Sequence, residues 1–341
     1  MTKKIGLLFL VLCSFGSCAK KTETQAPKSS FKVGMVFDVG GRGDKSFNDS
    51  AYRGLERAQK ELGITFQYIE PAGESDRESA LRQLASQNYD LVVGIGFLFT
   101  DDVTRVAQDF PNQKFACVDY SILPGKTLPP NLLALRFREE EGSYLVGALA
   151  GLTTKTNTVG FVGGMDIPLI HKFESGYKAG FYKVNPKGKV LVGYAGMTGE
   201  AFKDPTKGKQ LGLAQYNSGA DIIFHASGST GLGVFEAARQ KGKLAIGVDA
   251  DQYHEAPGYI LTSMIKKVDE SVYKTIEKAL HGEFKGGVWE LGLKENGVDY
   301  VLDDNNRALI SKDVLAKVDA LRKEIEAGSI KAPKTREELV N

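Results

Sequence analysis

The sequence is poor in the residue types on which disulfide-stabilised and zinc-dependent proteins rely. Its 341 residues include three cysteines and four histidines. Cys13 lies within an apolar N-terminal run and Cys18 at its end, so only Cys117 is expected in the folded body, where no internal disulfide can form. The histidines are scattered and show none of the spacings typical of zinc sites. Cys117 stands in an apolar run and is expected to be a small buried hydrophobic residue.

The chain also carries little net charge. The chain carries 44 Lys and Arg against 42 Asp and Glu, and loss of Lys3 and Lys4 with an N-terminal signal would leave 42 against 42. A chain without a basic surplus offers no electrostatic footprint for nucleic acid. No apolar run beyond the N-terminal segment is long enough to cross a membrane.

The N-terminus has the features of an export signal. Residues 3–12 form a short basic start followed by an apolar run that is too short to span a bilayer. Small residues then lead into Cys18, as in the lipobox where a bacterial lipoprotein is cut and acylated. We therefore predict a signal peptide at 1–17, lipidation at Cys18 and a polar tether at 18–30. The alternative is an ordinary signal peptide that contains a cysteine.

The body of the chain alternates between short β-branched apolar runs and longer runs of helical period. Strands with apolar residues on both faces are typical of a parallel sheet covered by helices on each side. One sheet would use only half of these units, so we predict two. The candidate strands are 32–38, 64–69, 91–94, 114–118, 132–137, 158–162, 189–194, 221–224, 243–248 and 259–264.

The prediction for the body is an α/β protein of two doubly wound, Rossmann-like lobes. About 310 residues follow the tether, which suits two domains of ordinary size. The expected boundaries are 31–153 plus 259–285 for the N-terminal lobe, 154–258 plus 286–330 for the C-terminal lobe, and 331–341 for a tail.

Ligands of open α/β sheets bind beyond the carboxyl ends of the strands. Asp38 stands at such an end, and the glycine-rich segment after it leads to Phe47 and Asn48 at a helix start. An aromatic plane beside two polar groups of opposite preference suits a flat heterocycle. The segment is not a phosphate-binding P-loop, because Asp44 separates the last glycine from Lys45. A structural role for Phe47, as a hydrophobic staple of the helix, stays open.

Further polar residues follow other strands. Asp119 and Asp249 could each accept hydrogen bonds from sugar hydroxyls, or could be helix caps or solvated charges. Lys266 follows another apolar run. Gly228 lies in a second glycine-rich turn, which could present backbone N–H groups to a ligand or be a plain tight turn.

Several ordered motifs resemble the basic membrane protein family of bacterial lipoproteins, which includes the purine nucleoside receptors of ABC importers. The likeness recurs along nearly the whole mature chain. The matching segments are 38–40, 44–48, 141–151, 160–164, 219–224, 246–252 and 261–269.

The resemblance implies a type I periplasmic-binding-protein fold with a nucleoside held in the cleft between the lobes. It implies no cofactor, no metal and no catalytic residue, and partners in an ABC permease and ATPase at the cell membrane. The expected ligands are adenosine, guanosine and inosine, and the protein would face the periplasm or the cell exterior. The ligand-binding residues implied are Asp38, Phe47, Asn48, Asp119, Phe202, Gly228, Asp249 and Lys266.

In this reading Phe47 and Phe202 stack on the purine, while Asp38 and Asn48 bond its polar edge and Asp119 faces the base. Asp249 and Lys266 would hold the ribose hydroxyls, and Gly228 would supply a backbone contact.

Other functions remain open at this stage. A nucleoside hydrolase would explain carboxylates near a sugar, but no nucleophile elbow or metal-spaced histidines are visible. A sugar-responsive transcription regulator would need a helix-turn-helix where this chain has its signal and tether. The same fold could also bind another small solute, or act as a surface adhesin or sensor.

Overall fold

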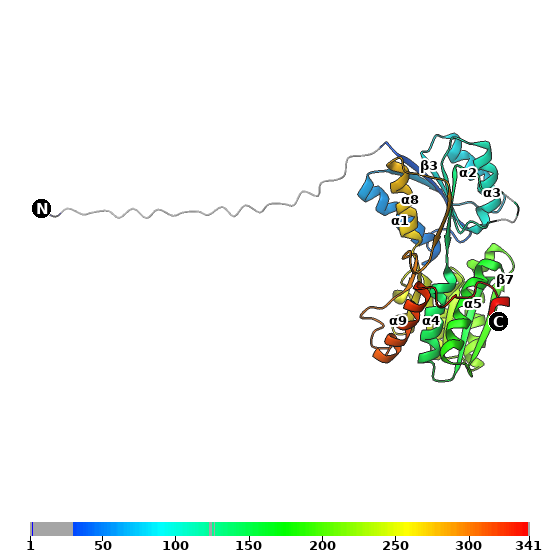
Figure 1. The fold of residues 1–341 in the computed structure, drawn as a ribbon, viewed down its shortest axis with the longest axis vertical. Helices are drawn as coiled ribbons and strands as arrows, with labels where there is room; N and C mark the ends of the chain where they lie inside the picture. The colour runs from blue at the N-terminus through cyan, green and yellow to red at the C-terminus, as the bar shows by residue number, and fades with distance from the viewer. Residues whose placement is uncertain (1, 3–29, 123–124, 126, 340–341) are drawn as a thin grey trace.

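The computed structural model describes residues 2, 30–122, 125 and 127–339, and within these the chain forms two lobes, each built on one sheet (Figure 1). Apart from Thr2 and Ser30, the predicted signal peptide and tether, including Cys18, lie outside the described residues. Among the described residues, no helix is both long and apolar enough to cross a membrane.

The N-terminal lobe is a parallel sheet with helices on both faces. Its strands are β1 (Lys32–Val36), β2 (Thr65–Ile69), β3 (Leu91–Ile95), β4 (Phe115–Val118), β5 (Leu132–Phe137) and β11 (Gly287–Leu291). Its helices are α1 (Phe47–Leu62), α2 (Asp76–Ser86), α3 (Thr100–Asp109), α8 (Val268–Leu280) and the short 3-10 helix η1 (Phe97–Phe99). The strand order is β11-β5-β4-β3-β1-β2. Helices α1 and α8 pack together on one side and α2 and α3 on the other, so β3 is buried along its length.

The C-terminal lobe repeats this plan. Its strands are β6 (Thr158–Met165), β7 (Lys189–Gly196), β8 (Ile222–Ala226), β9 (Leu244–Asp249), β10 (Ile260–Lys266) and β12 (Val298–Tyr300). Its helices are α4 (Glu139–Thr153), α5 (Pro168–Val184), α6 (Pro205–Asn217), α7 (Thr230–Lys241), α9 (Lys312–Glu326), η2 (Gly199–Phe202), η3 (Tyr253–Glu255) and η4 (Glu337–Leu339). The order is β12-β10-β9-β8-β6-β7, and β12 runs antiparallel to β10. Helices α4 and α5 pack as one pair and α6 and α7 as another.

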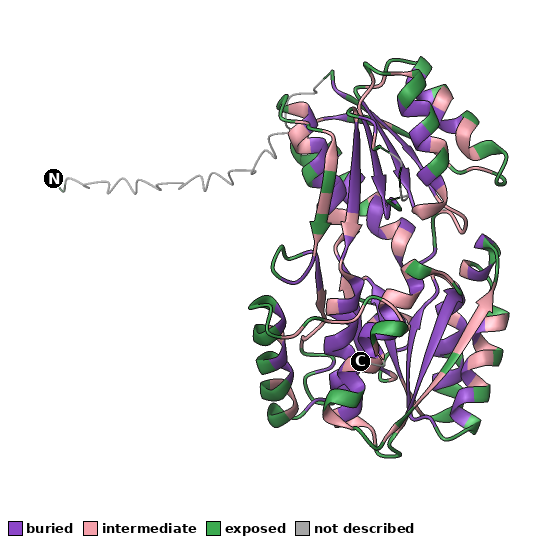
Figure 2. Cartoon of the chain, turned by 45° about the vertical axis from the view of Figure 1, so that its right-hand side comes forward, coloured by how far each residue is buried: buried purple, intermediate pink, exposed green. Residues whose placement is uncertain are grey.

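These two sheets confirm the predicted α/β fold of two lobes. Buried residues fill the central strands of both sheets, whereas the edge strands β2, β7 and β11 are intermediate or exposed, and exposed residues gather on the outer helices (Figure 2). Cys117 is buried in β4 as a free thiol, as expected from its apolar surroundings.

The described chain crosses between the lobes three times. It crosses at Arg138, between β5 and α4, at Lys267, between β10 and α8, and again between β11 and β12. The crossings bond one another, because the Arg138 N–H donates to the Leu291 carbonyl at 3.0 Å and the Lys267 N–H to the Gly297 carbonyl at 2.8 Å. Three bonded connections form a hinge between the lobes.

The expected boundaries differ from the observed lobes at α4. We predicted residues 31–153 for the N-terminal lobe, but α4 packs on α5 in the C-terminal lobe. Glycines allow this close contact: a Cβ at Gly147 would lie 2.1 Å from the Tyr177 carbonyl oxygen, and one at Gly180 would lie 1.9 Å from that of Tyr144. The chain therefore changes lobe after β5.

The return segments also differ from expectation. Strand β10 was assigned with 259–285 to the N-terminal lobe but pairs with β9 in the C-terminal sheet, while α8 does return to α1. Strand β11 was assigned with 286–330 to the C-terminal lobe but pairs with β5. The predicted tail packs on the C-terminal lobe, because Arg336 donates a hydrogen bond to Glu174 of α5. Its last described residue is Leu339.

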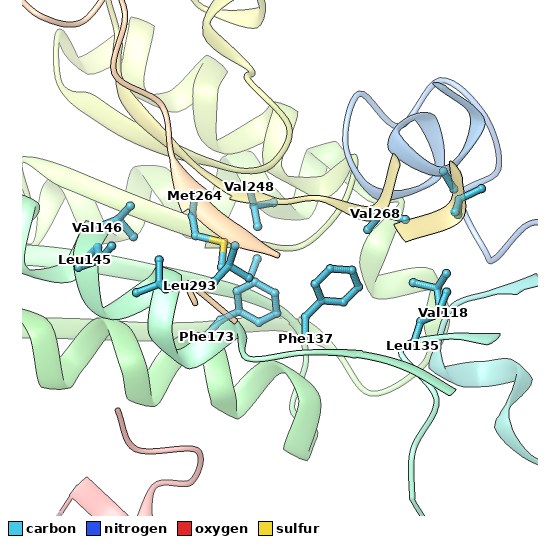
Figure 3. Close-up of a cluster of buried hydrophobic side chains, with 14 of the residues drawn as sticks. Val118, Leu135, Phe137, Leu145, Val146, Phe173, Val248, Met264, Val268 and Leu293 are labelled. Atoms are coloured by element: carbon cyan, nitrogen blue, oxygen red, sulfur yellow. The ribbon is translucent and has the colours of Figure 1, made fainter. Parts of the chain in front are cut away.

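A hydrophobic cluster continues from one lobe into the other across the hinge. Figure 3 shows Val118 and Leu135 of the N-terminal lobe, Phe137 beside the first crossing, and Met264 of the C-terminal lobe within this cluster. Apolar packing therefore extends to the edge of the space between the lobes, and polar residues such as Asp119 and Lys266 lie beyond that edge.

Candidate functional site

The carboxyl ends of strands from both sheets border one cavity between the lobes. The empty space measures about 600 Å³ and opens partly to solvent. All of the residues predicted for ligand binding line it: Asp38, Phe47, Asn48, Asp119, Phe202, Gly228, Asp249 and Lys266.

Two of the strand-end carboxylates sit on strained backbone. Asp119, directly after β4, has φ of 61°, and Asp249, at the end of β9, has φ of 66°. This left-handed conformation is unfavourable for residues other than glycine, although aspartate tolerates it better than most. Such strain gathers at functional sites. Both residues are less than a tenth exposed and come from different lobes.

In the N-terminal lobe, Asp38 and Asn48 are fixed by hydrogen bonds. The Val39 N–H donates to Asp38 Oδ1 at 2.7 Å, and the Asp38 N–H donates to Asn48 Oδ1 at 3.2 Å. Asp44, which sequence reasoning did not select as a ligand-binding residue, accepts from Asn48 Nδ2 at 3.2 Å and so orients the amide. Loss of water raises the pKa of the half-buried Asp38 carboxyl to about 7.

Aromatic rings reach the cavity from both lobes. Phe47 begins α1, and Phe202 ends η2. The Phe202 ring lies against the backbone of β6, since a Cβ at Gly164 would approach it to 2.3 Å. Phe97 of η1 meets Phe202 edge-on across the lobes, with ring centroids 6.3 Å apart.

Lys266, the last residue of β10, places its ammonium group at the hinge side of the cavity. Its Nζ donates to Asp119 Oδ2 at 2.6 Å and lies 5.1 Å from the ring centroid of Phe47. Among the described residues, Asp119 Oδ1 has no hydrogen-bond partner. A buried oxygen without a partner is costly, so this one is suited to a ligand donor. Burial opposes the charge of Lys266, but the carboxylates of Asp119, Glu139 and Asp249 together outweigh it and raise the lysine pKa.

Two hydrogen bonds join the lobes directly beside the cavity, and we call them the closing contacts. The Ser46 hydroxyl donates to Asp249 Oδ2, and Gln252 Nε2 donates to the Lys45 carbonyl at 2.9 Å. Gln252 is held in place because its Oε1 accepts from the Val248 N–H at 2.8 Å. Burial raises the pKa of Asp249 to about 6.

Sequence reasoning missed several residues of the cavity. Phe97 follows Gly96, directly after β3, so the strand-end rule used for Asp38 could have found it. Leu169, Ile170 and Phe173 belong to α5 and carry no such signal, because they face the cavity from within a helix.

The geometry is that of a binding site for a small polar molecule with a flat part. Aromatic rings, carboxylate acceptors and one buried ammonium donor converge from two lobes that are joined by three connections.

Known proteins share this architecture. The family model described as ABC transporter substrate-binding protein PnrA-like matches residues 31–336. A Pyrococcus furiosus protein named an uncharacterized lipoprotein is 42% identical over 87% of this chain and 77% of its own. The ABC transporter nucleoside-binding protein BmpA of Lactococcus lactis is 35% identical over 85% of this chain and 86% of its own.

A solved structure agrees with these relatives. The chain superposes on an ABC transporter solute-binding protein from Aeropyrum pernix K1 with a TM-score of 0.82, at 30% identity, covering 91% of this chain and 95% of the other. The resemblance recognised in the sequence is thus confirmed. The chain belongs to the PnrA-like (Bmp) family of ABC transporter substrate-binding proteins, which bind a substrate for transport rather than transform it.

Proposed function

We propose that this chain is a lipid-anchored receptor that binds purine nucleosides between its lobes and delivers them to an ABC permease. The observation that supports this most is the convergence of the eight predicted ligand-binding residues, from both lobes, on one cavity. Adenosine, guanosine and inosine are the ligands proposed. The L. lactis relative, named a nucleoside-binding protein, is consistent with this class of ligand.

The base would lie between aromatic rings. Phe47 from the N-terminal lobe and Phe202 from the C-terminal lobe both reach the cavity. Base stacking on an aromatic side chain contributes roughly 1–3 kcal/mol per base. Asp38 and Asn48 would bond the polar edge of the purine, and Asp119 Oδ1 would accept from a further donor of the ligand.

The ribose would lie toward the hinge and the C-terminal lobe. Asp249 would accept from sugar hydroxyls, as the acidic residue of a dinucleotide site does. Lys266 would donate to a sugar oxygen. Gly228 would supply a backbone contact, and the φ of 56° at this residue favours glycine. Free purine bases would therefore bind more weakly than nucleosides.

Ligand binding would favour the closed arrangement of the lobes. A nucleoside that bonds groups of both lobes gains all of its contacts only when the lobes are together, so it shifts the hinge equilibrium toward closure. The closing contacts also stabilise the closed arrangement, because each joins one lobe to the other. The permease, with its ATPase subunits, would recognise the closed form.

The anchor at Cys18 belongs to the same proposal. Relatives from Pyrococcus are named lipoproteins, which agrees with a lipid anchor on this chain. Lipidation would hold the receptor at the membrane surface, facing the periplasm or the cell exterior, within reach of the permease.

The test is calorimetric titration of the chain from Ser30 onward, after unfolding and refolding to remove bound ligand. The panel is adenosine, guanosine, inosine, cytidine, adenine and ribose. Purine nucleosides should bind in the micromolar range or tighter, and Phe47→Ala should weaken them while the exposed control Tyr182→Ala should not. Absence of heat and of any thermal shift with all six compounds would disprove the nucleoside assignment and direct the search to another solute.

A further inference from the structure

Behind Lys266 lies a pair of charged residues that does not line the ligand cavity. Glu139, the first residue of α4, is fully buried, and its Oε1 lies 3.0 Å from Lys266 Nζ. Lys172 of α5 donates to the other oxygen of the same carboxylate. Both residues line a neighbouring cavity, which shares Asp119 and Leu169 with the ligand cavity.

The pair is attached to the hinge. Lys172 also donates to the carbonyl of Phe137, the residue before the first crossing. Glu139 follows that crossing, and Lys266 precedes the second. One carboxylate and one ammonium group therefore connect two crossings of the hinge to the helix α5.

The charges of this network stabilise one another. Burial favours the neutral forms, yet Lys172 and Lys266 hold the pKa of the Glu139 carboxyl below its ordinary value. Glu139, with Asp119, in turn raises the pKa of Lys266 against the effect of burial. A buried ammonium group stays in place only while such partners remain charged.

The Lys266 ammonium group forms ion pairs with two carboxylates, those of Asp119 and Glu139, and its position depends on both. Asp119 Oδ2 at 2.6 Å draws the ammonium group toward the N-terminal lobe, and Glu139 draws it toward the hinge. Lys172 bonds Glu139 and also lies 3.5 Å from Oε2 of the buried Glu140, and its positive charge weakens the attraction between Glu139 and Lys266.

We infer that Glu139 and Lys172 are positioning residues for sugar recognition: they hold the Lys266 ammonium group where it can donate to the ribose of a bound nucleoside. This inference rests on the proposed function. Glu139 and Lys172 would thus contribute to the discrimination between nucleoside and free base without contacting the ligand themselves.

The test uses the double variant Glu139→Gln/Lys172→Met of the chain from Ser30 onward, which contains every described helix and strand. This variant keeps the net charge and nearly the side-chain volumes. The control is Glu174→Gln/Lys178→Met. Glu174 is also buried, with its side chain 2% exposed, but it bonds Lys178, Tyr194 and Arg336 rather than Lys266.

The measured quantity is the ratio of the dissociation constants of adenine and adenosine. In the double variant this ratio should fall about tenfold, the effect of one hydrogen bond to a charged group, while the affinity for adenine stays unchanged. The control should keep the wild-type ratio. The single variant Lys172→Arg, which keeps the positive charge, should show most of the wild-type ratio of the two dissociation constants.

Three results would overturn the inference. In the first, the double variant folds and keeps the wild-type ratio. In the second, its affinities for adenine and adenosine fall together, as expected of general structural damage. In the third, the wild type binds no nucleoside, which disproves the proposed function and the inference with it. If the double variant does not fold, Lys172→Met alone is measured, and it should lower the same ratio because Glu139 then draws Lys266 away from Asp119.

Discussion

The Ser46 hydroxyl, in the segment that leads into α1, donates a hydrogen bond across the cleft to Asp249 at the end of β9. Ser46 is fully buried but does not line the ligand cavity, whereas Asp249 does. One carboxylate thus takes part both in the contact between the lobes and in the proposed recognition of the sugar.

Ser46→Ala should weaken binding of every ligand by a similar factor. The variant removes a contact of the closed form but no ligand contact, so closure costs about 1 kcal/mol more and affinity falls about fivefold. Calorimetric titration with adenosine and adenine measures both factors, and Ser79→Ala on the outer helix α2 is the control. Loss of affinity for adenosine alone would contradict this role.

Phe47→Ala and Phe202→Ala should lower the affinity for nucleosides and for free bases alike, because the rings are proposed to stack on the base. The expected loss is about 1–3 kcal/mol for each ring. Asp249→Ala should weaken adenine only about fivefold, through loss of the closing contact with Ser46, and should weaken adenosine more. An aromatic variant that left adenine binding unchanged would contradict the stacking role.

Asp38 should make the free energy of unfolding depend on pH. Loss of water raises its pKa from 3.8 to about 7, so the folded protein binds this proton more tightly than the unfolded chain does. The contribution of this carboxyl to stability therefore decreases as pH rises from about 4 to 7 and is constant above that range.

Asp38→Asn removes this dependence and should raise the free energy of unfolding at pH 8 by about 1–3 kcal/mol, with little change at pH 4. Urea unfolding of the ligand-free protein at both pH values measures the difference, with the exposed Asp304→Asn as control. An equal effect of Asp38→Asn at pH 4 and pH 8 would contradict the assignment.

Phosphorylated nucleosides should bind poorly. Among the described residues, the ionisable side chains that line the cavity are one lysine and four aspartates, namely Lys266, Asp38, Asp44, Asp119 and Asp249. A phosphate added to the sugar would meet like charges in a site that is only partly open to solvent. Adenosine 5′-monophosphate should therefore bind at least about tenfold more weakly than adenosine in competition experiments at constant ionic strength. Equal affinities would show that the sugar end opens to solvent.

The strand ends were the part of the site that sequence could predict. Asp38, Asp119 and Asp249 all stand at the carboxyl ends of apolar runs, and the topology of parallel sheets brings such ends to one edge. Their convergence on one cavity follows from that rule. Phe173 could not be predicted in this way, because its position depends on how α5 packs beside the hinge.

The lobe boundaries could not be predicted from strand order alone. A strand such as β11 has the same pattern whichever sheet it joins, and its pairing with β5 is decided by tertiary packing. The glycines of α4 and α5 carried a usable signal, since Gly147 and Gly180 lie where the two helix backbones touch. Closing contacts such as Ser46 with Asp249 join residues 203 positions apart, and no local pattern marks them.

The most direct test of the account is a crystal structure of the chain from Ser30 onward with adenosine. The account predicts the purine between Phe47 and Phe202, with the ribose bonded to Asp249 and Lys266 and both closing contacts formed. A nucleoside bound elsewhere, or a cavity that holds a different molecule and excludes adenosine, would contradict it.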